Sequence, residues 1–258
     1  MKNILLLSFV LCFTLHSYPQ KYVKVWSDEF NTPGLPDSTK WGYEVGKVRN
    51  NELQYYTYKR SENARIADTV LILEARKEDY KGAAYTSASL MSKLKGDWLY
   101  GKFEFSAKVP TGKGTWPAIW MLPTKSEYGG WPKSGEMDIM EYVGMNPDNL
   151  YYTAHFQGTD GTGHQSSGKE TTSPQPYSKF VNFTFVWSPT SLEWYADGVL
   201  KFTYAKSADD KRIWPYNKMF YLILNLAYGG EWGAQKGVDD TMLPHQFLID
   251  YVRVYQLQ

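Results

Sequence analysis

Cysteine is nearly absent from this sequence of 258 residues, which has only Cys12, inside an apolar segment at the start of the chain. A single cysteine excludes a disulfide within the chain, and no thiol is left downstream for catalysis or redox chemistry. Cys12 could still serve as a site of lipid attachment. Because Leu11 stands where a bacterial lipobox has a small residue, lipidation is the less favoured alternative.

The sequence also lacks the histidine spacings of a zinc enzyme. None of its four histidines belongs to a His-Glu-x-x-His run or to a paired cysteine and histidine motif. We therefore expect no metal or other cofactor to take part in catalysis.

An excess of charge of one sign is missing as well. The chain has 28 Lys and Arg against 27 Asp and Glu, a formal net charge of +1. A nucleic-acid partner would require a basic surface, so we expect none. Aromatic residues make up 17% of the chain, and their flat apolar faces with hydrogen-bonding edges suit the rings of a neutral polysaccharide.

No apolar run in the sequence is long enough to span a membrane. The run over residues 4–15 follows Lys2, and a basic start before a short apolar stretch is typical of a secretory signal peptide. We expect a signal peptide over residues 1–18, with cleavage between His16 and Gln20. The mature protein would then be secreted, periplasmic or held at the cell surface.

Long stretches with helical periodicity are also missing, while short alternating runs bounded by Gly, Pro, Asn and Asp recur. The pattern predicts an all-β fold with two antiparallel sheets in one domain over residues 19–258. Asp197-Gly198 predicts a type I′ hairpin turn. We expect mobile loops over Thr159–Pro176 and Glu231–Pro244, and strands over Val70–Ala75, Lys102–Lys108, Glu136–Tyr142, Tyr151–Phe156, Phe183–Trp187, Met219–Leu226 and Leu248–Tyr255.

Three carboxylates are concentrated in one of these predicted strands, at Glu136, Asp138 and Glu141. Side chains alternate between the two faces of a strand, so Glu136 and Asp138 share a face and Glu141 would point the opposite way. A β-bulge at Ile139 or Met140 would add one residue and return Glu141 to the same face. The three acids would then share one surface.

Such a group of acids suits glycoside hydrolysis. Neighbouring carboxylates raise one another's pKa, so one tends to keep a proton. Hydrolysis with retained configuration requires a protonated acid and a carboxylate about 5–5.5 Å apart, and Glu136 and Glu141 are the candidate pair. The alternative is a solvated acidic strand face. The apolar residues interleaved with the acids and the tryptophans nearby favour the catalytic interpretation: Met137, Ile139, Met140, Trp116, Trp120 and Trp131.

The acidic run resembles the catalytic signature of glycoside hydrolase family 16 in its bulged, laminarinase-like form. Similar segments extend along the chain, at residues 26–31, 51–57, 100–104, 114–123, 224–230 and 249–256. The resemblance implies a curved jelly-roll sandwich with a concave substrate groove. It also implies an endo-acting, retaining hydrolase of β-glucans or marine galactans, with Glu136 as nucleophile, Glu141 as acid/base and Asp138 assisting Glu136.

The resemblance also assigns substrate-binding aromatic residues. Trp116 and Trp120 are four residues apart on one strand face, where they would stack on glucosyl rings. Pro117 between them predicts an exposed edge strand or a bend. Trp232 resembles a residue of the groove wall.

Polar contacts are implied in the same way. Asn51 and Asn225 match positions that contact sugar hydroxyls, although hydrogen bonds in a turn or at a strand edge are an alternative for each. His155 resembles a histidine beside the acid/base. Glu29 and Asp250, with the backbone carbonyl of Thr69, match a structural calcium site on the convex face.

The identity of the glucan stays open at this point. Laminarinases often have Arg at the position of Ser89, and its loss here makes mixed-linkage β-1,3-1,4-glucan a competitor of β-1,3-glucan. Galactans are less favoured. A transglycosylase and a non-catalytic glucan-binding module are the alternatives to a hydrolase, although such modules lose the acids. We expect a monomer.

Overall fold

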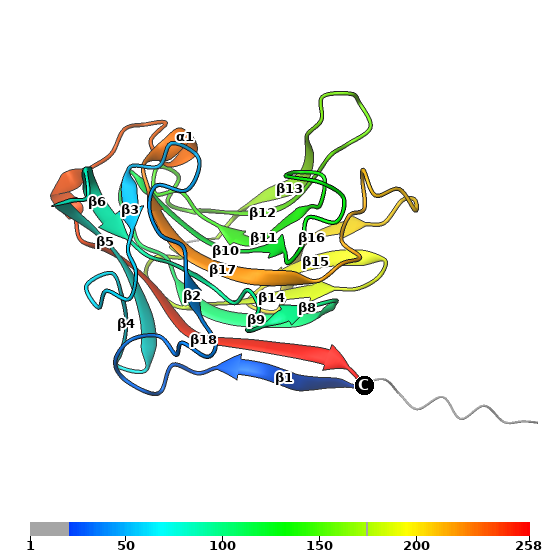
Figure 1. The fold of residues 1–258 in the computed structure, drawn as a ribbon, viewed down its shortest axis with the longest axis horizontal. Coiled ribbons are helices and arrows are strands. Elements are labelled where there is room, and N and C mark those ends of the chain that lie inside the picture. The colour runs from blue at the N-terminus through cyan, green and yellow to red at the C-terminus, as the bar shows by residue number, and fades with distance from the viewer. Residues whose placement is uncertain (1–20, 174) are drawn as a thin grey trace, which may run out of the picture.

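The computed structural model describes residues 21–173 and 175–258. The predicted signal peptide over residues 1–18, its cleavage site and Cys12 lie outside the described residues. The regular secondary structure of the described chain is almost entirely strand, and the strands form two stacked and curved sheets (Figure 1). No helix of the described ranges is long and apolar enough to cross a membrane.

The first sheet has ten strands in the order β16-β15-β14-β9-β18-β5-β6-β3, with β1 beside β18 and β4 beside β5. Its strands are β1 (Tyr22–Asp28), β3 (Gln54–Tyr56), β4 (Ala64–Ala67), β5 (Val70–Tyr80), β6 (Ala83–Ser87), β9 (Gly101–Lys108), β14 (Val181–Trp187), β15 (Ser191–Ala196), β16 (Val199–Ala205) and β18 (His245–Leu257).

The second sheet has eight strands in the order β13-β12-β11-β10-β17-β7-β2, with β8 beside β17. Its strands are β2 (Gly42–Tyr43), β7 (Ser89–Met91), β8 (Asp97–Trp98), β10 (Thr115–Pro123), β11 (Glu136–Glu141), β12 (Asn149–Phe156), β13 (Gln165–Thr172) and β17 (Phe220–Tyr228). The acidic run occupies β11, near the middle of this sheet.

The core lies between the two sheets and takes up much of the aromatic content. Along β12, Leu150, Tyr152, Ala154 and Phe156 are buried, while the residues between them face away from the core. This alternation is the period of two that a half-buried strand requires. The inner faces of both sheets are therefore buried in the core, and the outer face of the second sheet is left to contact solvent or a ligand.

Three features depart from the predicted fold. β3 pairs with β6 in the parallel direction, so the strands are not all antiparallel. The predicted loop Thr159–Pro176 contains β13, because its backbone pairs with β12 along its whole length although its polar side chains stay mostly exposed. The loop Glu231–Pro244 is interrupted by a 3-10 turn, η1 (Asp240–Met242), and overlaps the helical turn α1 (Gly230–Gly233). The predicted hairpin at Asp197-Gly198 is confirmed by positive φ angles of 48° and 75°.

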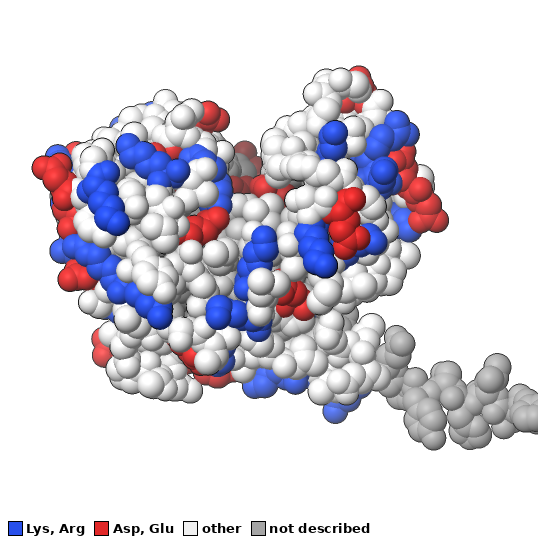
Figure 2. All heavy atoms as spheres, in the orientation of Figure 1, with Lys and Arg blue, Asp and Glu red and all other residues white. Residues whose placement is uncertain are grey.

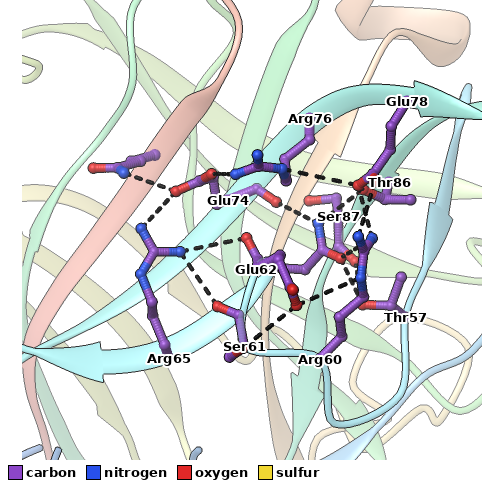
Figure 3. A network of polar contacts seen from close by, with 12 residues as sticks. Thr57, Arg60, Ser61, Glu62, Arg65, Glu74, Arg76, Glu78, Thr86 and Ser87 are labelled. Atoms are coloured by element: carbon purple, nitrogen blue, oxygen red, sulfur yellow. Dashed lines mark hydrogen bonds and ion pairs between the residues drawn. The ribbon is translucent and has the colours of Figure 1, made fainter. Parts of the chain in front are cut away.

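A network of ion pairs fastens β4, β5 and β18 together at one edge of the first sheet (Figure 3). Buried Glu74 accepts hydrogen bonds from Arg65 at 2.6 Å, from Gln246 at 2.8 Å and from Arg76. Because the charge of Glu74 is paired from several sides, its burial is compensated. The same edge continues through β6 and β3 into the loop at residues 49–52, which forms one wall of the groove described below.

Candidate active site

A cavity of about 460 Å³ opens on the outer face of the second sheet. Figure 2 shows the molecule hollowed between two raised walls, with acidic atoms at the bottom of the hollow. The floor comes from β10, β11 and β17. Glu136, Asp138 and Glu141 all line this cavity, so the three acids share one surface as predicted.

The bulge that permits this arrangement lies at Ile139. Along the β10–β11 pair, Glu141 is opposite Ala118 and Met140 is opposite Ile119, but the next partner of β10 is Asp138. Ile139 is therefore the extra residue, and the β11–β12 register shifts at the same place. The predicted bulge is confirmed, and it returns Glu141 to the face of Glu136.

Two features outside β11 fix the bulged strand. The indole Nε1 of fully buried Trp194, from β15 in the opposite sheet, donates to the backbone carbonyl of Asp138 at 2.8 Å. Gly135, just before the strand, has φ of 84°, and a Cβ there would come within 3 Å of Pro215 and Tyr216. Glycine is needed at this position because a side chain would have no room in that conformation.

Burial dominates the electrostatics of the three acids. Removal from water raises the pKa of Glu136 to about 8, with a further rise from the negative charge of Asp138. Burial likewise raises the pKa of Asp138 to about 8, although its hydrogen-bonding contact with Glu136 lowers the pKa in part. Burial, followed by the charge of Asp138, holds the pKa of Glu141 well above its usual range. Protons are thus retained in this group at neutral pH.

Each of the two glutamates accepts a hydrogen bond from a tryptophan. The Nε1 of Trp131 donates to Oε2 of Glu136 at 2.9 Å, and the Nε1 of Trp116 donates to Oε1 of Glu141 at 3.1 Å. Hydrogen bonds to the charged form lower a carboxyl pKa, so each indole partly opposes the effect of burial. These contacts also fix the direction in which each carboxylate points.

His155 lies in the acidic group, but beside Asp138 and Glu136 and not beside the acid/base Glu141 as predicted. It is opposite Glu136 in the β11–β12 ladder, and its Nε2 is 3.0 Å from Oδ2 of Asp138 and 3.9 Å from Oε1 of Glu136. The distance between His155 and Asp138 is that of an ion pair. It is not a hydrogen bond, because Oδ2 of Asp138 has no hydrogen-bond partner among the described residues. The other ring nitrogen, Nδ1, lies 3.0 Å from Nε2 of His164.

Comparison with known proteins agrees with this geometry. The model of the family described as glycosyl hydrolases family 16 matches residues 50–253. The chain belongs to glycoside hydrolase family 16.

The chain is also similar to named proteins and to solved structures. A β-glucanase of Rhodothermus marinus is 46% identical over 241 residues, covering 90% of this chain and 84% of the relative. The solved laminarinase of Rhodothermus marinus superposes with a TM-score of 0.88 at 44% identity, covering 93% and 99% of the two chains. SCLam, a non-specific endo-β-1,3(4)-glucanase, gives a TM-score of 0.86 at 40% identity over 93% of each chain. The predicted jelly-roll sandwich and the predicted family are confirmed.

The family's aromatic platform is present, with some altered roles. Trp116 and Trp120 share the cavity face of β10, as predicted. Trp120 is only 6% exposed, and the guanidinium of Arg49 already lies over its ring at 4.8 Å, so its stacking on a sugar stays a prediction. Trp232 packs edge-on against Trp116, with ring centroids 5.4 Å apart, and thereby supports the wall.

The edge strand predicted from Pro117 is wrong, because β10 is central and its register through Pro117 is unbroken against β17.

Asn225 lines the cavity, but its amide is used internally. Its Oδ1 accepts from Nε1 of Trp120 at 2.7 Å, and its Nδ2 donates to the hydroxyl of Tyr56 at 3.0 Å. Tyr56 in turn donates to Glu52 at 3.1 Å. This chain of hydrogen bonds fixes the floor of the groove, so Asn225 positions Trp120 instead of presenting a free amide to a sugar.

Asn51 is not among the residues that line the cavity, so its sugar contact stays a prediction. Its exposed side chain donates to Oε1 of Glu231 at 2.8 Å and is outside the cavity lining. The neighbouring residues Arg49, Asn50 and Glu52 line the cavity instead. A motif locates the loop, but the left-handed φ angles at Asn50 and Asn51 decide which side chain faces the groove.

Several groove residues were not identified from the sequence as functional. These are Arg49, Asn50, Glu52, Lys93, Ser126, Tyr221 and, as a hydrogen-bond donor to Glu136, Trp131. The Gly-Gly-Trp-Pro sequence before the acidic run is a signal that could have drawn attention to Trp131. No comparable signal marks Arg49.

The predicted calcium ligands do not fit the ion as their side chains stand. The register of β1, β5 and β18 brings Glu29, Thr69 and Asp250 to neighbouring positions. Both carboxylate oxygens of Glu29, however, accept hydrogen bonds from Arg253 at 2.7 to 3.1 Å. A guanidinium already neutralises the carboxylate that calcium would need. Calcium binding stays a prediction, and nothing below depends on it.

Proposed function

We propose that this family 16 enzyme cleaves β-1,3-glucan and mixed-linkage β-1,3-1,4-glucan within their chains, with retention of configuration. The observation that carries this proposal is the bulge at Ile139, which brings Glu136 and Glu141 into one buried, aromatic-lined groove. In this geometry two carboxyl groups face the same groove, and the double-displacement mechanism uses such a pair, one as nucleophile and one as acid/base.

The charge states support distinct roles for the two glutamates. The resemblance to the family signature assigns Glu136 as the nucleophile, and the hydrogen bond from Trp131 favours its ionised form. Glu141, whose pKa is held well above the usual range, gives its proton to the departing sugar oxygen. After the glycosyl-enzyme forms on Glu136, Glu141 is ionised and takes a proton from the incoming water. Asp138 and His155 lie beside Glu136 and influence its charge.

A neutral glucan suits the groove better than a sulfated polysaccharide. Four acids line the cavity, against Arg49 and Lys93 as cations, so sulfate groups would meet repulsion there. The relatives named above are a β-glucanase, a laminarinase and an endo-β-1,3(4)-glucanase. Because all three acids are present and face the groove, a non-catalytic glucan-binding module is disfavoured.

The proposal is tested by measuring reducing ends released from laminarin, barley mixed-linkage glucan, agarose and carrageenan. We expect release from the first two, and a loss of at least about 10²-fold in Glu136→Gln and Glu141→Gln. If the native chain released sugar from agarose or carrageenan alone, or if either variant kept a near-native rate, the proposal would be wrong. Chain-length analysis of the products would reveal transglycosylation.

We further propose that the protein acts outside the cytoplasm as a monomer. The basic and apolar start of the sequence supports export, and a polysaccharide substrate is found there. Fractionation of expressing cells, with N-terminal sequencing of the exported chain, tests this. A mature protein that begins between residues 16 and 21 is the expected result, and an uncleaved cytoplasmic chain would contradict it.

A further inference from the structure

Arg49 lies in the wall of the groove, in the loop between β2 and β3. Its guanidinium lines the same cavity as the three acids. The side chain is 21% exposed, so most of it is removed from water. A buried cation inside a groove for a neutral ligand needs a reason, because burial of a charge is costly unless it is paired.

One side of the Arg49 guanidinium is paired with a carboxylate. Its Nη2 donates to Oε1 of Glu44, whose Oε2 accepts a hydrogen bond from Ser89 at 2.7 Å. The Arg49 guanidinium also lies over the ring of Trp120, which is itself held by Asn225. The head group is thereby fixed on the floor of the groove.

The other side of the guanidinium is unused. Nη1 of Arg49 is buried and has no hydrogen-bond partner among the residues that the structure describes. A buried donor left unpaired costs free energy, and native proteins rarely leave one. Since Arg49 lines the cavity, a ligand that displaces the groups covering Nη1 would be its acceptor.

The charge around Arg49 identifies the kind of acceptor. Glu44 is bonded to it directly, and the charge of Glu52 acts on it as well, so the positive charge is already balanced. A sulfate or carboxylate would meet these two acids. A neutral oxygen accepts from Nη1 without that repulsion, and sugar hydroxyls are neutral oxygens.

We propose that Arg49 is a substrate-binding residue, whose free Nη1 donates to a hydroxyl of the glucosyl unit beside Trp120, and that Ser89 and Glu44 hold it in place. This inference rests on the proposed function. Ser89 is fully buried and small, which leaves room for Glu44 to reach Arg49. A long cationic side chain at residue 89 would compete with Arg49 for Glu44.

Binding without turnover tests the inference most directly. Laminarihexaose and a mixed-linkage hexasaccharide are titrated calorimetrically into Glu136→Gln, and then into the same variant carrying Arg49→Met or Arg49→Lys. Arg212→Met is the matched control, because Arg212 is half-exposed and paired with Asp210, and it is not part of the cavity lining. If Arg49→Met alone destabilises the fold by leaving Glu44 unpaired, Glu44→Gln/Arg49→Met replaces it.

We expect Arg49→Met to weaken binding by about 10- to 100-fold, the loss of a hydrogen bond from a charged donor. Arg49→Lys should lose most of this too, since a single ammonium cannot keep Glu44 and reach the sugar. Arg212→Met should bind normally. Unchanged affinity in both Arg49 variants would overturn the inference, whereas no binding to the Glu136→Gln parent would overturn the proposed function instead.

A kinetic readout separates contact from a merely electrostatic or structural role. In the active enzyme, Arg49→Lys keeps the positive charge near Glu136, so the acidic limb of the pH profile should stay in place while KM rises. Full recovery of KM in Arg49→Lys would mean that charge alone matters, and would contradict the proposed hydrogen bond. A lower kcat with unchanged KM would also contradict it.

Discussion

At the residue scale, each proposed catalytic carboxyl group has a dedicated indole donor. Trp131 serves Glu136 and Trp116 serves Glu141, so the two acids can be tuned separately although they lie on one strand. Trp131 is 56% exposed, and its indole still donates a hydrogen bond to Glu136. Large aromatic residues are therefore used here for their polar edge as much as for their faces.

Removal of either indole should shift one limb of the pH profile. Both hydrogen bonds favour the ionised carboxylate, so their loss raises the pKa of the acceptor. In Trp131→Phe the acidic limb of kcat/KM, set by Glu136, should move up by about 0.5 to 1 pH unit. In Trp116→Phe the basic limb, set by Glu141, should move up instead. A shift of both limbs in either variant would contradict separate roles.

The same burial that raises the pKa of Glu141 should reduce stability. A carboxyl group with a raised folded-state pKa binds more protons when folded, so stability is lost as pH rises above its unfolded value of about 4.3. Glu141→Gln removes this loss. We expect its melting temperature to exceed that of the native chain at pH 8 by about 3–5 °C for each pKa unit of the shift, and to match it at pH 4. A lower melting temperature at pH 8 would contradict this account.

At the scale of the element, the bulged strand β11 explains how much could be predicted. The spacing of Glu136, Asp138 and Glu141 requires an extra residue, and the sequence limited it to Ile139 or Met140. The choice of Ile139 depends on pairing with β10 and on Trp194 from the opposite sheet, contacts that no local pattern encodes. For the same reason the edge strand predicted from Pro117 was wrong, since the pairing of β10 with β11 and β17 places Pro117 in the middle of a sheet.

Changes in the length of β11 test the phase argument. Deletion of Ile139 leaves the acids at spacings of two, which an unbulged strand keeps on one face. Insertion of one alanine after Ile139 makes the spacing from Asp138 to Glu141 four, which turns Glu141 to the opposite face if the bulge is kept and moves it one strand repeat, about 6.6 Å, further from Asp138 if the bulge is lost. We expect the deletion to retain measurable glucan hydrolysis and the insertion to lose as much as Glu141→Gln does. Circular dichroism checks that both variants fold. Equal activity of both would contradict the role of strand phase.

At the scale of the whole molecule, the two faces of the second sheet have different roles. Its inner face packs against the first sheet, and its outer face forms the groove, so most of the aromatic content is assigned to one or the other. The alternating pattern predicted this division, together with the fold class. The groove wall at residues 49–52 was not predicted, because this loop meets the helical turn α1 only in three dimensions.

The central claim is that Glu136 forms a covalent bond with a glucan held beside Glu141. A 2-deoxy-2-fluoro laminaribioside with an activated leaving group would trap this intermediate, and peptide mass spectrometry would locate it. We predict one added 2-deoxy-2-fluoro-laminaribiosyl group, on Glu136, in the native chain and none in Glu136→Gln. Label on Glu141 or Asp138, or turnover of the probe with inversion and no adduct, would contradict the account.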